Sequence, residues 1–189
     1  MNVFLGIQAR LNSTRLPNKV MKKVNGYPIL FYVLERLKKT SLKEKIYVLT
    51  SLEKSDLRIV QYCKKNNVNF FRGNLKNVFL RYFEFAKKKK LDAVIRISAD
   101  SPLIDFNLVN KMYELFLKNR NYHLVTNIFP RTFPIGQSVE ILSSSALEII
   151  NQKKLTSEEK EHVTRFIYKN PKLFKILNYE NKKNENSVR

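Results

Sequence analysis

Short apolar runs alternate with amphipathic stretches along this chain. The first run, NVFLGIQA (residues 2–9), is rich in β-branched and aromatic residues and too short for a helix, so it predicts a buried strand. Further strands are predicted at KIYVLT, VNFF, DAVIRISA, HLVTN, SVEIL and KLFKILNY. The pattern thus divides the chain into strands separated by longer, more polar segments.

The segments between these runs carry apolar side chains at helical spacing. Helices are predicted from Pro28 to about Lys39, after Ser55 as N-cap, over 75–90, from Phe106 to Lys118 with Asp105 as cap, and over 144–153 and 157–169. Proline suits a first helical turn, and Ser or Asp at the N-cap accepts a bond from an otherwise unpaired N–H group.

Strand–helix alternation of this kind predicts an α/β fold with a largely parallel central sheet. Residues 1–189 show no repeat and no interdomain linker, so a single domain is expected. Ligands of such folds bind outside the carboxyl ends of the strands. That rule selects the segments Gln8–Lys19, Thr50–Glu53, Arg72–Asn77, Ala99–Leu103 and Thr126–Asn127.

Composition adds a large positive charge to this picture. The formal net charge is +20, which suggests nucleic acid, an anionic membrane surface or a phosphorylated ligand. The excess is mostly Lys, often in runs such as Lys87–Lys90 that complement a helix C-terminus and stay solvated. We therefore interpret most of the charge as compositional bias on the surface, and expect no specific nucleic-acid partner.

The sequence predicts no membrane partner and a cytoplasmic location. No apolar run approaches the roughly 18–20 residues of a membrane span, and the start of the chain lacks the features of a signal peptide. The single cysteine, Cys63, cannot form an internal disulfide, which suits a reducing compartment.

The loop QARLNSTRLPNK (Gln8–Lys19) follows the first predicted strand and is cationic. It contains no glycine, and it matches neither the Walker pattern nor Gly-x-Gly-x-x-Gly. Arginine offers two parallel donors to phosphate oxygens and lysine a mobile charge, so the loop is suited to a polyphosphate. The alternative is a solvated loop with incidental cations.

A second candidate segment is RISADSPLID, in which a strand ends at Asp100. A carboxylate at this position is suited to Mg²⁺, which usually takes one or two protein carboxylates and completes its shell with phosphates and water. The alternative, which the residues alone leave open, is that Asp100 caps a turn before Pro102.

The motif IQARLNSTRLPNKVM resembles a signature of the cytidylyltransferases that activate acidic sugars. These are the CMP-KDO and CMP-sialate synthetases, and the chain is most similar to the spore-coat polysaccharide proteins of the SpsF type. The resemblance continues through FFRGNLKNVFLRYFEFAK, VIRISADSPLID, LVTNIFPRTFPIGQSVEIL and EEKEHVTRFIY, over nearly the whole chain. It implies a three-layer α/β/α, Rossmann-like nucleotide-diphospho-sugar transferase fold.

The resemblance also implies an activity, transfer of CMP from CTP to an acidic sugar with release of pyrophosphate, for surface polysaccharide synthesis. By position in the motifs it assigns nucleotide binding to Ala9, Arg10, Ser13, Arg15, Lys19, Arg72 and Gly73. Arg10, Lys19 and Asp100 would be catalytic, and Asp100 would hold Mg²⁺. Glu140, His162 and Thr164 would contact the sugar, with His162 as a structural histidine the alternative. Related synthetases are often dimers, so a homodimer is expected.

Two departures from the family pattern shape the expectations. Ser138 stands where related sequences usually have Asp, and the family's next segment, with a further metal-binding Asp, would follow Arg189. The domain is therefore expected to lack the family's last strand and helix, which leaves a catalytically impaired nucleotide-binding paralogue or fragment as the alternative function. A nucleic-acid-binding protein is a weaker alternative, because it is motivated by charge alone.

Overall fold

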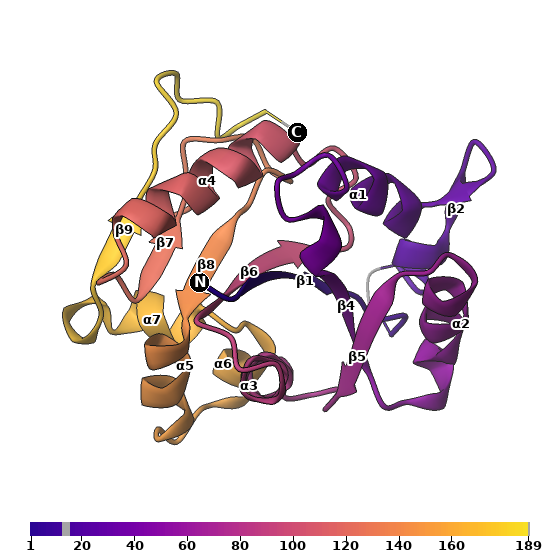
Figure 1. Cartoon of the computed structure of the whole chain (residues 1–189), viewed down its shortest axis with the longest axis horizontal. Coiled ribbons are helices and arrows are strands. Elements are labelled where there is room, and N and C mark those ends of the chain that lie inside the picture. The colour runs from indigo at the N-terminus through magenta and orange to yellow at the C-terminus, as the bar shows by residue number, and fades with distance from the viewer. Residues whose placement is uncertain (13–15, 189) are drawn as a thin grey trace.

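The computed structural model describes residues 1–12 and 16–188, and its centre is a seven-stranded sheet with the order β5-β4-β1-β6-β8-β7-β9 (Figure 1). Only β8 runs against its neighbours, β6 and β7; the other pairings in the sheet are parallel. The strands are β1 (Val3–Gln8), β4 (Ile46–Ser51), β5 (Asn69–Gly73), β6 (Ala93–Ser98), β7 (Leu124–Thr126), β8 (Glu140–Ser143) and β9 (Ile176–Asn178).

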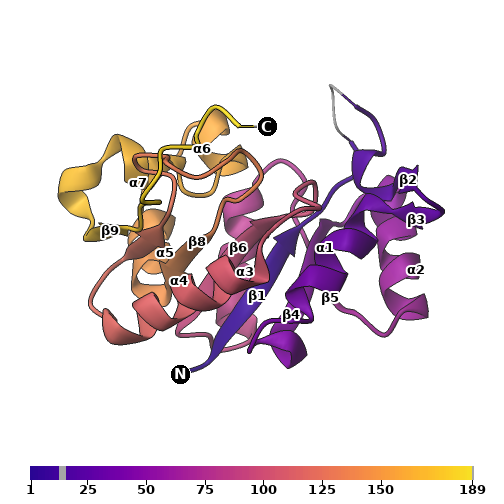
Figure 2. The same cartoon turned by 90° about the horizontal axis from the view of Figure 1, so that it is seen from above.

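Helices cover both faces of this sheet (Figures 1 and 2). The α-helices are α1 (Ile29–Leu37), α2 (Leu57–Lys65), α3 (Val78–Lys88), α4 (Phe106–Lys118), α5 (Ser144–Asn151), α6 (Ser157–Glu161) and α7 (Arg165–Lys169). Apolar residues of α1, α2 and α4 form one core with the sheet, and those of α3, α5 and α7 form a second core. This arrangement confirms the predicted three-layer fold with a mostly parallel sheet.

The central strands are buried on both faces, which explains their continuous apolar runs. In β6, Ile95 and Ile97 belong to the first core, whereas Val94 belongs to the second. Successive side chains of a strand point to opposite faces, so a strand covered on both sides needs apolar residues at every position.

The chain reverses its direction of travel across the sheet between β1 and β6. It runs from β1 outward through β4 to β5, and then returns to place β6 on the other side of β1. Such a switch point opens a crevice at the carboxyl ends of the two strands. Hydrogen bonds from Ala9 N to Leu49 O and from Ala99 N to Gln8 O, both 3.0 Å, fix the start of the loops that border this crevice.

The reversed direction of β8 brings Glu140 to the same edge of the sheet. Glu140 is the first residue of β8, and it pairs in register with Arg96 of β6 and Thr126 of β7. A residue at the start of an antiparallel strand therefore joins residues near the ends of parallel ones.

Two predicted helix boundaries were wrong. Ser55 caps no helix: it lies in the 3₁₀ turn η3 (Lys54–Asp56), and α2 begins at Leu57. The helix predicted over 157–169 is divided, because the backbone of His162 leaves the helical region at φ −105° and ψ 88°. The turn 162–164 therefore separates α6 from α7 and carries two of the predicted sugar-binding residues.

Other helix ends agree with their capping chemistry. The Asp105 side chain accepts a bond from Asn107 N, which confirms the predicted cap of α4. The helix predicted over 75–90 begins only at Val78, because the Asn77 side chain accepts from Leu80 N and ends the preceding loop there. Of the helices in the described ranges, none has both the length and the apolar composition needed to cross a bilayer.

Candidate functional site

Arg10 lies on the loop after β1 and forms an ion pair with Glu161 at the end of α6. Its Nη2 is 2.5 Å from Glu161 Oε1, and the two side chains are 32% and 43% exposed. The hydrogen bond from Arg10 lowers the pKa of Glu161. Arg10, predicted to bind the triphosphate, thus stands at the crevice with a protein carboxylate as its partner.

Lys19 and Asp100 come together across the β1–β6 crevice. Lys19 Nζ is 2.7 Å from Asp100 Oδ2, and Ser98 Oγ donates to Oδ1 of the same carboxylate. Burial raises the pKa of Asp100, but the hydrogen bonds from Lys19 and Ser98 lower it, and the net effect is a lowered pKa. The carboxylate thus faces Lys19 and Ser98, and its predicted role in holding Mg²⁺ stays a prediction.

The remaining predicted residues of the first loop divide into two groups. Ser13 and Arg15 lie outside the described residues. Ala9 is 1% exposed, and its N–H already donates to the carbonyl of Leu49. Ala9 therefore positions the start of the loop, and its predicted contact with nucleotide stays a prediction.

Arg72 and Gly73 shape the loops after β4 and β5. Arg72 Nε donates to Ser51 O at 3.0 Å, and its Nη2 donates to Leu52 O at 2.7 Å. These loops border a cavity of about 510 Å³, but neither Arg72 nor Gly73 is among the described residues that line it, and their predicted nucleotide contact stays a prediction. The lining residues are Leu52, Glu53, Asn74, Leu75, Lys76, Asn77 and Lys160.

Arg81, on α3, binds the backbone of the loop after β5, and the sequence analysis did not predict this role. It is fully buried, and its guanidinium donates to the backbone carbonyls of Leu49, Asn74 and Leu75. Burial lowers the pKa of Arg81. Gly73 permits this packing, because a Cβ there would lie 2.8 Å from Arg81 Cγ. A cation inside the apolar stretch VFLRYF was the available signal.

Asp56 joins the loops that follow β1 and β4. Its carboxylate is fully buried and accepts from Leu11 N at 2.7 Å, from Ser51 N at 3.2 Å and from the Ser51 hydroxyl. Buried backbone N–H groups need a partner, and Asp56 supplies one to each loop. No local pattern in the sequence indicates this role, because the contact with Leu11 spans 45 residues.

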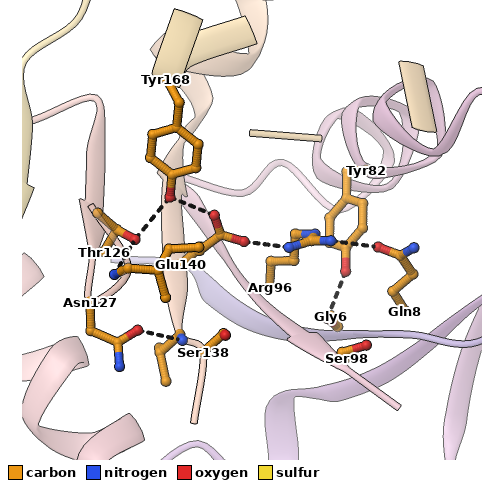
Figure 3. Close-up of polar contacts among 12 residues, drawn as sticks. Gly6, Gln8, Tyr82, Arg96, Ser98, Thr126, Asn127, Ser138, Glu140 and Tyr168 are labelled. Carbon is orange, nitrogen blue, oxygen red and sulfur yellow. Dashed lines mark hydrogen bonds and ion pairs between the residues drawn. The ribbon is translucent and has the colours of Figure 1, made fainter. Parts of the chain in front are cut away.

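A buried polar network extends from Gln8 through Arg96 and Glu140 to Tyr168 (Figure 3). Arg96 pairs with Glu140 through Nη1 and donates from Nη2 to Gln8 Oε1 at 3.2 Å. The Tyr168 hydroxyl donates to the second Glu140 oxygen at 2.6 Å and lies 2.9 Å from Thr126 Oγ1.

The pKa shifts in this network follow from burial and from the ion pair. Burial lowers the pKa of Arg96, but the charge and hydrogen bond of Glu140, together with the nearby Tyr82 and Tyr168, raise it by more in sum. Burial and the nearby Glu140 charge both raise the pKa of Tyr168. Arg96 thus stays cationic and Tyr168 stays a neutral hydrogen-bond donor.

The three predicted sugar-binding residues line one cavity of about 430 Å³ beside this network. Glu140 and Thr164 are buried, whereas His162 is exposed and its ring makes no hydrogen bond to the described residues. The complete lining is Arg96, Ile128, Glu140, His162, Thr164, Arg165, Tyr168 and Lys169. The structure therefore brings these residues together from β8 and the turn before α7.

Ser138, which stands where a carboxylate was expected, faces a guanidinium. Its hydroxyl accepts a hydrogen bond of 2.9 Å from Arg131 Nη2. A carboxylate at this position would pair with Arg131, whereas the serine offers the guanidinium only a neutral acceptor and so a weaker contact.

The donor set at Asp100 is small. Within the described ranges, no group of three or more His, Cys, Asp or Glu side chains is placed to hold a metal ion. Asp100 offers one carboxylate beside the Ser98 hydroxyl. Mg²⁺ that arrives with a nucleotide needs no more than one or two protein carboxylates, so this set fits a metal bound together with phosphates.

Two proteins are similar in sequence to most of this chain. The chain is 39% identical over 174 residues to the uncharacterized protein MJ1063 of Methanocaldococcus jannaschii, covering 92% of this chain and 70% of that protein. It is 27% identical over 176 residues to the spore coat polysaccharide biosynthesis protein SpsF of Bacillus subtilis, covering 90% of this chain and 71% of that protein.

A solved structure matches the whole fold. A cytidylyltransferase from Leptospira borgpetersenii serovar Hardjo-bovis superposes with a TM-score of 0.96 and 36% identity, covering 100% of this chain and 80% of that chain. The family model described as cytidylyltransferase matches residues 6–188. On these grounds the chain belongs to the cytidylyltransferase family of nucleotidyltransferases.

Proposed function

We propose that this protein transfers CMP from CTP to an acidic sugar, with release of pyrophosphate, for the synthesis of a surface polysaccharide. One observation carries the proposal: the predicted phosphate-side residues and the predicted sugar-side residues gather at one edge of the sheet. The first set is Arg10, Lys19 and Asp100, and the second is Glu140, His162 and Thr164. Arg96 joins the two sides through Gln8 and Glu140.

The reaction requires positioning more than covalent chemistry from the protein. The acceptor hydroxyl oxygen forms a bond to the α-phosphorus of CTP, the bond to the pyrophosphate oxygen breaks, and the hydroxyl proton is released. Arg10 and Lys19 would grip the phosphates and offset the charge that grows on the leaving pyrophosphate. Mg²⁺, held by Asp100 together with the phosphates, would supply further charge neutralisation.

Both cations have protein partners that a nucleotide can replace. Arg10 pairs with Glu161 and Lys19 pairs with Asp100, and all four side chains are about one-third exposed or more. Exposed ion pairs of this kind contribute only about 0–1 kcal/mol. Phosphate oxygens therefore offer Arg10 and Lys19 a stronger partner at little cost to the fold.

Pyrophosphate release measured with CTP, Mg²⁺ and a panel of acidic sugars tests the proposal. We expect release with CTP and at least one acidic sugar, and little with UTP, GTP or ATP. Release that prefers UTP or GTP would reject the cytidylyl assignment. Release with neutral sugars alone would reject the acidic acceptor.

A second candidate is a nucleotide-binding protein of the same family without turnover. The uncharged Ser138, bonded to Arg131, favours it, because this position was expected to carry a carboxylate. Tight binding of CTP by calorimetry, together with no pyrophosphate release from any acceptor, would select this function. Ser138→Asp would then be expected to restore release.

A further inference from the structure

Helix α7 adds two cations to the cavity beside Glu140. Arg165 and Lys169 lie one helical turn apart, and both line this cavity. Side chains at i and i+4 share one face of a helix. Neither residue had a predicted role, although the stretch EEKEHVTRFIY (158–168), which carries part of the resemblance, includes Arg165.

The residues on the cavity wall carry a net positive charge, and Glu158 and Glu159, the carboxylates that pair with the α7 cations, are not among the described lining residues. Among the described residues that line the cavity, the cations are Arg96, Arg165 and Lys169, and the one carboxylate is Glu140. Both Glu140 oxygens are already engaged, one by Arg96 and the other by Tyr168. The cations of α7 consequently face the cavity without a carboxylate on its wall to neutralise them.

The other groups on the wall are suited to a polyol. Thr164, His162 and Tyr168 provide hydroxyl and imidazole groups, and Tyr168 stacks on Phe129 with ring centroids 4.8 Å apart. A volume of about 430 Å³ is within the usual range for a small-molecule site. Among the described residues, the Nε–H groups of Arg96 and Arg165 are buried without an acceptor. An anionic polyol would complement such a wall.

We propose that Arg165 and Lys169 bind the carboxylate of the acceptor and thereby select an acidic sugar. This inference rests on the proposed function, which it deepens by naming the groups that recognise the acid. Arginine and lysine form their strongest hydrogen bonds with carboxylates, and a neutral sugar offers no comparable partner.

Glu158 is the carboxylate that the acceptor would replace as the partner of Arg165 and Lys169. Arg165 Nη2 is 2.6 Å from Glu158 Oε1, and Lys169 Nζ is 3.6 Å from Glu158 Oε2. Glu158 thus holds both cations, and all three side chains are between 42% and 48% exposed. A carboxylate in the cavity would take the place of the glutamate, which keeps both cations paired throughout.

The triphosphate of CTP is the competing anion for these two cations. Arg10 and Lys19, however, stand on the loop after β1, at the β1–β6 crevice, and α7 faces the cavity next to β8. The two anions of the reaction would then have separate pairs of cations. Separate Michaelis constants for CTP and for the acceptor distinguish these possibilities.

The test compares Arg165→Gln and Lys169→Gln with wild type and with Lys172→Gln. Lys172 is an exposed lysine that does not line the cavity, so its substitution controls for the loss of one positive charge. The probes are 3-deoxy-manno-octulosonate and N-acetylneuraminate, each as free acid and as methyl ester, with pyrophosphate release as the readout.

We expect the KM for the free acid to rise about tenfold in each α7 variant, since each loses a charge-assisted hydrogen bond. The KM for CTP should stay within about twofold of wild type, which also shows that the variants fold. Methyl esters should be poor acceptors for wild type and should not become worse in the variants.

Other results would overturn the inference in distinguishable ways. An unchanged KM for the acid rejects it and leaves the proposed function standing. A parallel rise in the KM for CTP would mean that the two cations bind the triphosphate instead. An equal rise in the KM for the acid in Lys172→Gln would mean that the loss of one positive charge anywhere on the surface causes the effect. No release with either free acid in wild type would reject both the inference and the acidic acceptor.

Discussion

Two sets of charged residues lie at the same edge of the sheet, and they differ in burial. The pairs Arg10–Glu161 and Lys19–Asp100 have side chains that are 32–43% exposed. In the Arg96–Glu140 pair the corresponding values are 20% and 1%. We call Arg10–Glu161 and Lys19–Asp100 the rim pairs. The Arg96–Glu140 pair belongs, with Tyr168, to the buried network described above.

This difference separates a binding role from a scaffolding role. An exposed pair contributes about 0–1 kcal/mol, so a ligand can replace one partner at small cost. Removing one partner of a buried pair costs about 3–5 kcal/mol, because it leaves a charge without compensation. The rim pairs are therefore suited to exchange with phosphate, whereas the buried network fixes the shape of the cavity.

The largest expected effect is on stability, in a matched pair of substitutions. Glu140→Gln should lower the free energy of unfolding by about 3 kcal/mol, because the Arg96 guanidinium loses its buried counter-charge. Glu161→Gln, the same chemical change at the rim, should cost less than about 1 kcal/mol. Urea unfolding of both variants measures the difference. Equal decreases in the free energy of unfolding would show that the rim pairs and the buried network contribute alike to stability, whatever their burial.

The next effect concerns affinity for CTP. Arg10→Ala and Lys19→Ala should each weaken CTP binding by about tenfold or more, because each removes a cation that can bond to phosphate. Neither should change the free energy of unfolding by more than about 1 kcal/mol. Calorimetric titration with CTP gives the affinity.

Glu161→Gln provides the opposite control for the same measurement. It removes the carboxylate that competes with phosphate for Arg10, so CTP should bind as well as in wild type or better. Unchanged CTP affinity in both Arg10→Ala and Lys19→Ala would remove the rim pairs from the site.

A smaller effect is expected at Gly73, which packs against the buried cation Arg81. A Cβ at this position would lie 2.8 Å from Arg81 Cγ, so Gly73→Ala should destabilise the protein by about 1–2 kcal/mol. Arg81→Ala removes the side chain that the new Cβ at position 73 would contact. A double-mutant cycle should therefore show coupling between the two positions. Additive losses of stability would mean that Gly73 does not serve this packing.

Much of the fold could be predicted because it depends on local pattern. The apolar runs of β1 and β6 are long enough for strands and are buried on both faces, so alternation with helices identified the fold class. Asp100 and Lys19 could be placed together, because loops after neighbouring parallel strands share one edge. Asn25 and Gly26 form the turn of the hairpin β2 (Lys23–Val24) and β3 (Tyr27–Pro28), a signal that was present but not used.

The buried network could not be predicted, because its contacts depend on register across the sheet. Arg96 and Glu140 are 44 residues apart, and only the antiparallel pairing of β6 with β8 places them opposite each other. The turn at His162 was also missed, since the residue types of 157–169 are compatible with one continuous helix. Tyr168 and the α7 cations enter the site only because of that turn.

The smallest expected effect is a pH dependence at His123, which directly precedes β7 and belongs to neither set. His123 Nδ1 accepts a hydrogen bond of 3.0 Å from Lys175 N, between β7 and the segment before β9. Burial and the Lys175 charge lower the pKa of His123, because both disfavour the imidazolium. A protonated ring would also lose this acceptor.

The direction of this pH dependence follows from how many protons the folded and the unfolded protein bind. The unfolded chain, with a histidine pKa near 6.5, binds this proton more readily than the folded protein does. The stabilisation is therefore complete above about pH 6.5 and is lost as pH falls toward the lowered folded value. Glu161 and Asp100, whose pKa values are lowered, titrate below this window and do not obscure it.

Urea unfolding at several pH values between 5.5 and 7.5 measures the effect. Wild type should lose less than about 1 kcal/mol over this range, and His123→Gln, which keeps an acceptor but does not titrate, should flatten the dependence. His162→Gln is the matched control, since it removes the other histidine and should retain the slope that His123 contributes. If the free energy of unfolding of His123→Gln depends on pH as strongly as that of wild type, protonation of His123 does not affect stability through this contact.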